Sequence, residues 1–250
     1  MKKKLTGALA LMTFGLACAQ SNVDVSTQSG DSNYATITQT GQTNSNTLLQ
    51  TGNSNLADVD QTGWSNVNTA TSTGSFNEVD ADQVGTDNGN TVIQTGFANW
   101  AKTFQSGSDN MTAQQQNGNF SDVQADQQGG DNAVYQDQFG NADWAAVSQA
   151  GNNNYAHQLQ SGHFNIAYYN QSGNDNSADS HQTGNGNGSL GVQTGNSNEL
   201  GQFQTGAGNW AADVMMGDHN YISLVQNGQN HLHMGMQSGQ SNTIIVSQSN

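Results

Sequence analysis

An 11-residue period runs through most of the chain and constrains its fold more than any other feature. Twenty consecutive units extend from Gln28 to Ser247 without a slip in register, and the first reads QSGDSNYATIT. The third position is Gly in every unit, the first is Gln in eighteen units, and the sixth is Asn in seventeen. The exceptions are Ser72 and Met215 at the first position, and Ser121, Asp143 and His231 at the sixth. An array this regular predicts stacked structural repeats.

The residues within each unit favour a short strand and a turn. An 11-residue period also occurs in right-handed coiled coils, but a Gly in every unit and many β-branched residues oppose a helix. Positions two to five, such as residues 51–54, carry Gly, Asn and Ser, which favour turns, and positions seven to eleven, such as residues 34–38, can form a strand. We therefore predict an all-β protein, a β-solenoid whose twenty strand-turn units form ten 22-residue coils with amyloid-like cross-β stacking.

Alternation along each strand indicates which side chains face inward. If the Gln at the first position points inward, so do positions six, eight and ten. Positions eight and ten are often small or aliphatic, as at Ala35 and Ile37. Among the acidic residues inside the array, only Asp143 and Asp213 fall on inward positions, as expected where burial of a charge is costly. The inward Gln and Asn should then form columns in which each amide bonds to the next coil.

These columns and the turn glycines are the candidate functional residues, because they determine how coils stack. The predicted ladder residues are Gln28, Asn33, Gln39, Asn44, Gln50, Asn55, Gln149, Asn154, Gln160, Asn165, Gln171, Asn176, Gln237 and Asn242. The predicted turn glycines are Gly30, Gly41, Gly52, Gly151, Gly162, Gly173 and Gly239.

The N-terminus has the pattern of a secretion signal. Three Lys at 2–4 precede an apolar run over 5–16, and Ala17-Cys18-Ala19 supplies small residues for cleavage. We predict a Sec signal peptide at 1–19, a short leader at 20–27, the repeat solenoid at 28–247 and a C-terminal end at 248–250. An acylated Cys18 is the alternative, but Gly15 stands where a lipobox has Leu. The apolar run is too short for a permanent membrane anchor, so no membrane insertion is expected.

Beyond the signal, Lys102 is the single Lys or Arg against 19 acidic residues. This charge opposes binding to nucleic acid or to anionic lipid.

No group of residues points to catalysis or to a cofactor. His231 and His233 share a strand face and could be a metal pair, but the six His have no fixed place in the unit, so we predict no metal site. The paired acids Asp58 and Asp60 face outward, which favours a solvated surface over acid-base chemistry. Calcium-binding β-rolls repeat every nine residues, whereas this chain repeats every 11. An ice-binding face needs an unbroken Thr array, whereas outward acids such as Asp58 and Asp60 interrupt the Thr here. We predict a protein that is not an enzyme, with no catalytic residue and no cofactor.

The units resemble the repeat of curlin, the subunit of bacterial curli fibres. Those beginning at Gln28, Gln50, Gln149, Gln160 and Gln171 match the pattern Q-x-G-x-x-N-x-A-x-x-x-Q throughout. The resemblance implies a subunit that passes unfolded through a dedicated outer-membrane secretion pore. It also implies polymerisation on the cell surface, seeded by a minor nucleator subunit, into fibres that serve adhesion and biofilm matrix. The inward Gln and Asn would then be the residues that drive stacking.

The last unit and the chain ends bear on the kind of subunit. Nucleator subunits tend to end in a basic, divergent repeat, whereas residues 237–250 contain no Lys or Arg and keep the pattern. The array reaches within three residues of the C-terminus without a visible cap, so we expect head-to-tail polymerisation into a secreted, cell-surface fibre of the Gram-negative type. The alternatives are a curli nucleator and a monomeric solenoid that serves as an adhesin or stalk.

Overall fold

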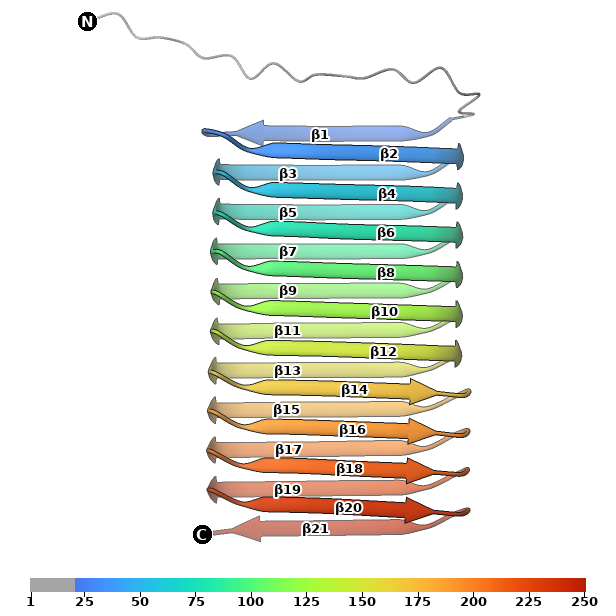
Figure 1. Cartoon of the computed structure of the whole chain (residues 1–250), viewed down its shortest axis with the longest axis vertical. Coiled ribbons are helices and arrows are strands. Elements are labelled where there is room, and N and C mark those ends of the chain that lie inside the picture. The colour runs from blue at the N-terminus through green and yellow to red at the C-terminus, as the bar shows by residue number, and fades with distance from the viewer. Residues whose placement is uncertain (1–20) are drawn as a thin grey trace, which may run out of the picture.

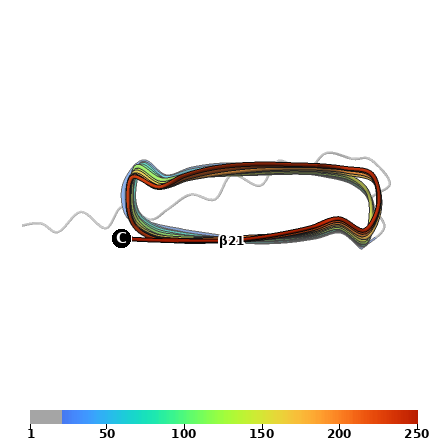
Figure 2. The same ribbon diagram turned by 90° about the horizontal axis from the view of Figure 1, so that it is seen from below.

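The chain folds as a flat, two-layered β-solenoid whose coils stack along one long axis. The computed structural model describes residues 21–250, so the predicted signal peptide lies outside the described residues. Two sheets face each other across a narrow interior, and the coils superimpose when viewed end on (Figures 1 and 2). Every strand pairs in parallel with the strand two places along the chain, in a register that joins residues such as Gln83 and Gln105. The predicted all-β solenoid with 22-residue coils is confirmed.

Successive strands alternate between the two sheets. The 11-stranded sheet, here called the odd sheet, contains β1 (Val23–Ser29), β3 (Ser45–Asn53), β5 (Val67–Ser75), β7 (Gly89–Phe97), β9 (Met111–Asn119), β11 (Ala133–Asn141), β13 (Tyr155–His163), β15 (Ser177–Asn185), β17 (Glu199–Ala207), β19 (Tyr221–Gln229) and β21 (Thr243–Ser249). The 10-stranded even sheet contains β2 (Tyr34–Gln42), β4 (Leu56–Trp64), β6 (Glu78–Thr86), β8 (Trp100–Ser108), β10 (Asp122–Gly130), β12 (Trp144–Asn152), β14 (Ile166–Ser172), β16 (Gly188–Thr194), β18 (Trp210–Met216) and β20 (Leu232–Ser238). Among these described residues, no helix is long and apolar enough to cross a bilayer.

The strands are longer, and the turns tighter, than the sequence predicts. Strand β2 continues through Gln39 and Gly41 to Gln42, so the prediction of a turn over positions two to five is wrong in its extent. Gly41 has a φ of +105°, a conformation open to Gly, and it bends the strand without ending its pairing. After β2 the reversal is confined to the fifth and sixth positions, where Thr43 adopts a left-handed φ of +56°. Strands β14, β16, β18 and β20 end before their glycine and have longer reversals.

One further strand precedes the first unit of the array. Residues Val23–Ser29 form β1, which pairs in register with β3. Asn22 occupies the place of a sixth-position Asn, and its side-chain oxygen accepts a hydrogen bond from the backbone N–H of Asn44 at 2.9 Å. The solenoid therefore has twenty-one strands, and the region expected to be a leader contributes to the stack.

The interior is thin and mixes small aliphatic side chains with amides. Two apolar clusters lie along the axis, one in the N-terminal half around Leu48, Val79 and Val123 and one in the C-terminal half around Tyr169 and Leu200. Between them and the turns stand buried Gln and Asn, and these amides make up much of the core. A core this polar is stable only if its amides are hydrogen-bonded.

Two glycines of β7 test whether the stacked turn requires Gly. A Cβ at Gly96, where φ is +128°, would overlap the carbonyl oxygen of Gly118 in the next coil, whereas a Cβ at Gly89 meets no atom within 4 Å. We expect Gly96→Ala to lose at least about 1–3 kcal/mol of stability from its backbone conformation alone, and Gly89→Ala to change it little. The guanidinium midpoint of the β-sheet circular dichroism measures both, and equal midpoints would contradict this account.

Candidate functional site

The Gln side chains at the first position form hydrogen-bonded columns inside the solenoid. Nε2 of Gln83 donates to Oε1 of Gln105 at 2.9 Å, and Gln105 donates likewise to Gln127 at 2.9 Å. The same Nε2 of Gln83 also donates to the backbone carbonyls of Val67 and Asn88, both at 3.0 Å. Each Gln therefore joins its own coil to its neighbours, and the donors of the column all point toward the C-terminal end.

The Asn side chains at the sixth position form columns of the opposite direction. Nδ2 of Asn88 donates back to Oδ1 of Asn66 at 3.0 Å, and the backbone N–H of Asn88 donates to the same oxygen at 3.2 Å. Nδ2 of Asn88 also reaches forward to the carbonyl oxygen of Gly107 at 3.1 Å. The Asn of one turn therefore holds the bent glycine of the next coil, which explains why the two positions are so regular.

The structure places the predicted ladder residues according to their distance from the ends. Those in interior coils are buried: Asn44, Gln50, Asn55, Gln149, Asn154, Gln160, Asn165, Gln171 and Asn176. Gln237 is also buried, although it lies on β20, the last strand of the even sheet. Those in the outermost coils are half-buried: Gln28, Asn33, Gln39 and Asn242. The predicted turn glycines all have positive φ, between +105° and +131°: Gly30, Gly41, Gly52, Gly151, Gly162, Gly173 and Gly239.

The two exceptions at the first position have different effects on the Gln columns. Ser72 preserves the direction of the column, because its hydroxyl donates to Oε1 of Gln94 at 3.0 Å. Met215 offers no donor and packs within an apolar cluster instead. Among the described residues, Oε1 of Gln237 in the following coil is consequently buried without a hydrogen-bond partner. Met215 therefore interrupts one Gln column near its C-terminal end.

Two exceptions at the sixth position are neighbours in one Asn column. The backbone N–H of Asp143 approaches the Ser121 hydroxyl at 3.4 Å, and Oδ1 of Asp143 accepts from the side chain of Asn165 at 3.1 Å. The other oxygen, Oδ2, is buried and has no partner within the described residues. Burial raises the pKa of Asp143, although the Asn165 hydrogen bonds and His163 act in the opposite direction. This carboxyl group stands where other coils place an amide donor.

Restoring Asn at this position should stabilise the protein at neutral pH. Because the pKa of Asp143 is raised in the folded state, its contribution is most favourable below 3.8 and is lost as pH rises through the folded pKa. We expect Asp143→Asn to add about 1–3 kcal/mol at pH 7, with the gain shrinking in acid. Denaturation midpoints from pH 3 to pH 8 measure it. Asp131→Asn, at an exposed turn, is the control, and an equal gain there would contradict the explanation.

A second pair of variants tests the Gln column itself. Gln127 is buried; its Nε2 donates to Gln149 at 3.0 Å and its Oε1 accepts from Gln105 at 2.9 Å, whereas the adjacent Gln128 is exposed. We expect Gln127→Ala to cost about 2–4 kcal/mol, because it leaves a cavity and two unpaired amides. Gln128→Ala should change the denaturation midpoint little. Similar losses in both variants would show that the column is not what stabilises this region.

The outward acids form a charged strip on the even sheet. Asp58 stands beside Asp80, and Asp60 beside Asp82, on adjacent strands. Burial, then the charges of Asp60 and Asp80, raise the pKa of Asp58. Nζ of Lys102 lies 2.6 Å from Oδ2 of Asp80, so the single Lys beyond the predicted signal neutralises part of the strip.

The two C-terminal histidines have separate partners. Nε2 of His233 lies 2.9 Å from Oδ1 of buried Asp213, whose other oxygen accepts from Gln202 at 2.7 Å. His231 approaches the backbone carbonyl of Asn227 at 3.3 Å. Sequence reasoning missed the pairing of Asp213 with His233. A spacing near 22 residues, which stacks two side chains in adjacent coils, is the signal that could have found it.

Comparison with known families gives one match. Residues 30–63 match the family model described as the curlin associated repeat. This segment spans β2, β3 and most of β4, with the ladder residues of those coils. The match supports assignment of the repeat to the curlin repeat family and favours a structural role. A comparison with curated protein sequences found no match.

Proposed function

We propose that this chain is a secreted structural subunit that assembles head to tail into extracellular fibres of the curli type, as the major subunit. The curlin repeat match and the cross-β solenoid support this proposal. The partners would be further copies of the chain, a nucleator subunit and an outer-membrane secretion pore. The fibres would serve adhesion and biofilm matrix outside the cell.

The observation that carries the proposal is the complementary chemistry of the two ends. Within residues 21–250, Oε1 of Gln28 and Gln39 at the N-terminal end receives no hydrogen bond, while Gln248 at the C-terminal end uses its Nε2 only on Leu232 O at 3.1 Å. The Asn column runs the other way, and none of residues 21–250 donates a hydrogen bond to Oδ1 of Asn242. A head-to-tail copy continues both columns, whereas two identical ends would bring like groups together.

The strand edges and the end coils support the same arrangement. Within the described part of the chain, the outer edges of β1, β2, β20 and β21 pair with no other strand. Inward side chains that are fully buried in middle coils are only half-buried here, as at Ile37, Ile244 and Val246. Stacking a second copy would bury this surface and complete both sheets.

Refolding residues 20–250 tests the proposal directly. After dilution from denaturant, we expect a lag, then thioflavin-positive fibrils by electron microscopy, with a meridional reflection near 4.7–4.8 Å and acceleration by preformed seeds. A stable β-rich monomer that never polymerises would overturn the fibre function and leave a monomeric adhesin or stalk.

Two neighbouring residues of β21 provide matched variants for this assay. Val246 faces inward at the end coil and would be buried at the junction, while Ile245 faces outward and is 74% exposed. Val246→Lys should slow seeded elongation at least about tenfold, because the junction would bury an unpaired charge. Ile245→Lys should elongate nearly as fast as the wild type. Equal rates for the two variants would argue against end-to-end stacking at this face.

A further inference from the structure

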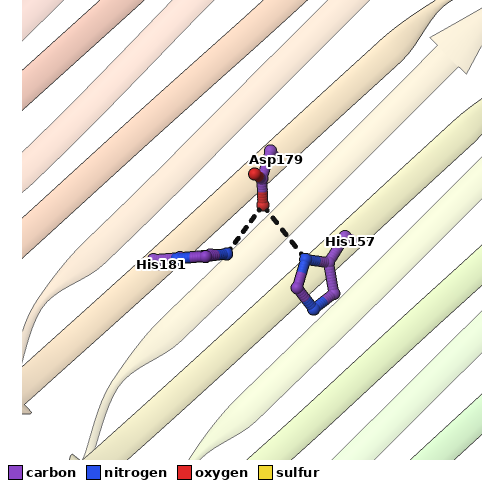
Figure 3. A group of neighbouring side chains, drawn as sticks. All are labelled: His157, Asp179 and His181. Carbon is purple, nitrogen blue, oxygen red and sulfur yellow. Dashed lines mark ion pairs between the residues drawn. The ribbon is translucent and has the colours of Figure 1, made fainter.

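Three side chains converge on the outer face of the odd sheet, away from the ladders. His157 on β13 stands directly beside Asp179 on β15, and His181 follows two residues later on the same face (Figure 3). Nδ1 of His157 lies 3.2 Å, and Nε2 of His181 lies 3.1 Å, from the same oxygen, Oδ1 of Asp179. The three atoms all lie within 4.8 Å of one another. They form the one group of three or more His, Cys, Asp and Glu ligands that the described residues bring together.

Ion pairing with Asp137 and Asp179 accounts for the position of His157, whose pKa these two carboxylates raise to about 9, but it leaves two polar atoms of the cluster unpaired. Oδ1 of Asp179 and Nε2 of His181 are both shielded from solvent, yet neither makes a hydrogen bond within the described part of the chain despite their 3.1 Å separation. The two atoms are therefore close to each other but lack the alignment that a hydrogen bond requires. Two shielded polar atoms without partners are costly, and an atom that binds both would remove that cost.

Neighbouring side chains hold the two imidazoles in place. The other ring nitrogen of His157, Nε2, lies 3.6 Å from Oδ2 of Asp137 on β11. A carboxylate behind the distal nitrogen is the usual support for a metal-binding His, because it fixes the ring and its tautomer. The ring of His181 packs edge-on against His157 and against Phe203, with centroids 5.2 Å apart in each case. The cluster is therefore held together before any ligand binds.

We propose that His157, Asp179 and His181 bind a divalent transition-metal ion, with Zn²⁺ as the fitting representative. Bonds of about 2.0–2.2 Å in a tetrahedral site place ligand atoms roughly 3.3–3.6 Å apart, so the separations of 3.2 and 3.1 Å observed here need to widen by only a few tenths of an ångström. Two imidazole nitrogens and one carboxylate oxygen suit such an ion, whereas Ca²⁺ and Mg²⁺ prefer oxygen ligands. Three protein ligands leave a fourth position for water. The side chains are partly exposed, so an ion can enter from solvent.

Equilibrium dialysis of residues 20–250 against Zn²⁺ at pH 8 tests the site, because it reports bound metal whether the chain is monomeric or polymeric. We expect one tightly bound Zn²⁺ per chain, unaffected by excess Ca²⁺. His157→Gln and His181→Gln should each weaken this binding at least about tenfold, and Asp137→Asn, which removes only the supporting carboxylate, about tenfold or more.

A matched control keeps the result interpretable. His219 is an exposed turn residue outside the cluster, so His219→Asn should bind Zn²⁺ as the wild type does. Circular dichroism of each variant reports whether the solenoid is intact, and the outward positions of His157 and His181 predict that it is. Wild-type Zn²⁺ affinity in both cluster variants, or equal losses in His219→Asn, would overturn the proposal. So would a wild-type chain that retains no Zn²⁺.

Discussion

The need to hydrogen-bond every buried amide is the constraint on which the rest of this solenoid depends. The interior is too thin and too polar to be held by apolar burial alone, and an unpaired buried amide costs more than a paired one contributes. Exact stacking solves the problem, since Gln83 bonds Gln105 and Asn88 bonds Asn66 across coils. The same stacking requires the bent Gly107, whose carbonyl accepts from Asn88. The ladders, the turns and the parallel register are therefore one coupled arrangement.

Much of this arrangement could be predicted from the sequence, because the sequence shows both the 11-residue period and the alternation of inward and outward residues along each strand. The solenoid and its 22-residue coils follow from the recurring Gln, Gly and Asn. The continuation of most strands through the third-position glycine did not follow from the sequence. A glycine such as Gly41 suggests a turn, yet with a positive φ it keeps its strand pairing. Ala98 and Phe76 adopt left-handed φ near +55° although their types disfavour it, so local preference yields to stacking there. Contacts between coils, such as that of His157 with Asp179, can be predicted only once it is known which units stack on each other.

The outward side chains of the strands take no part in the interior Gln and Asn ladders, and they differ most from one coil to the next. The strip of paired acids with Lys102 lies on the even sheet, and the histidine cluster lies on the odd sheet. At one edge, Phe97 packs edge-to-face against Phe76 and Phe120, with centroid distances of 5.3 and 5.4 Å. Substitutions on the outer strand faces leave the interior ladders in place, because the amides of those ladders point inward. At the turns, exposed Asn such as Asn152 and Asn174 also bond across coils. In a fibre, each outward group would recur along the filament.

The alternation of strands between two sheets makes the solenoid unequally tolerant of changes in length. Gain or loss of 22 residues adds or removes a full coil and returns every later strand to its own sheet. Gain or loss of a single 11-residue unit preserves the ladders but transfers all later strands to the opposite face. His157 and Asp179 lie one full coil apart, so losing a unit between them would place them on opposite sides of the molecule. Duplication by whole coils is therefore the route by which such a chain can lengthen and keep its surface pattern.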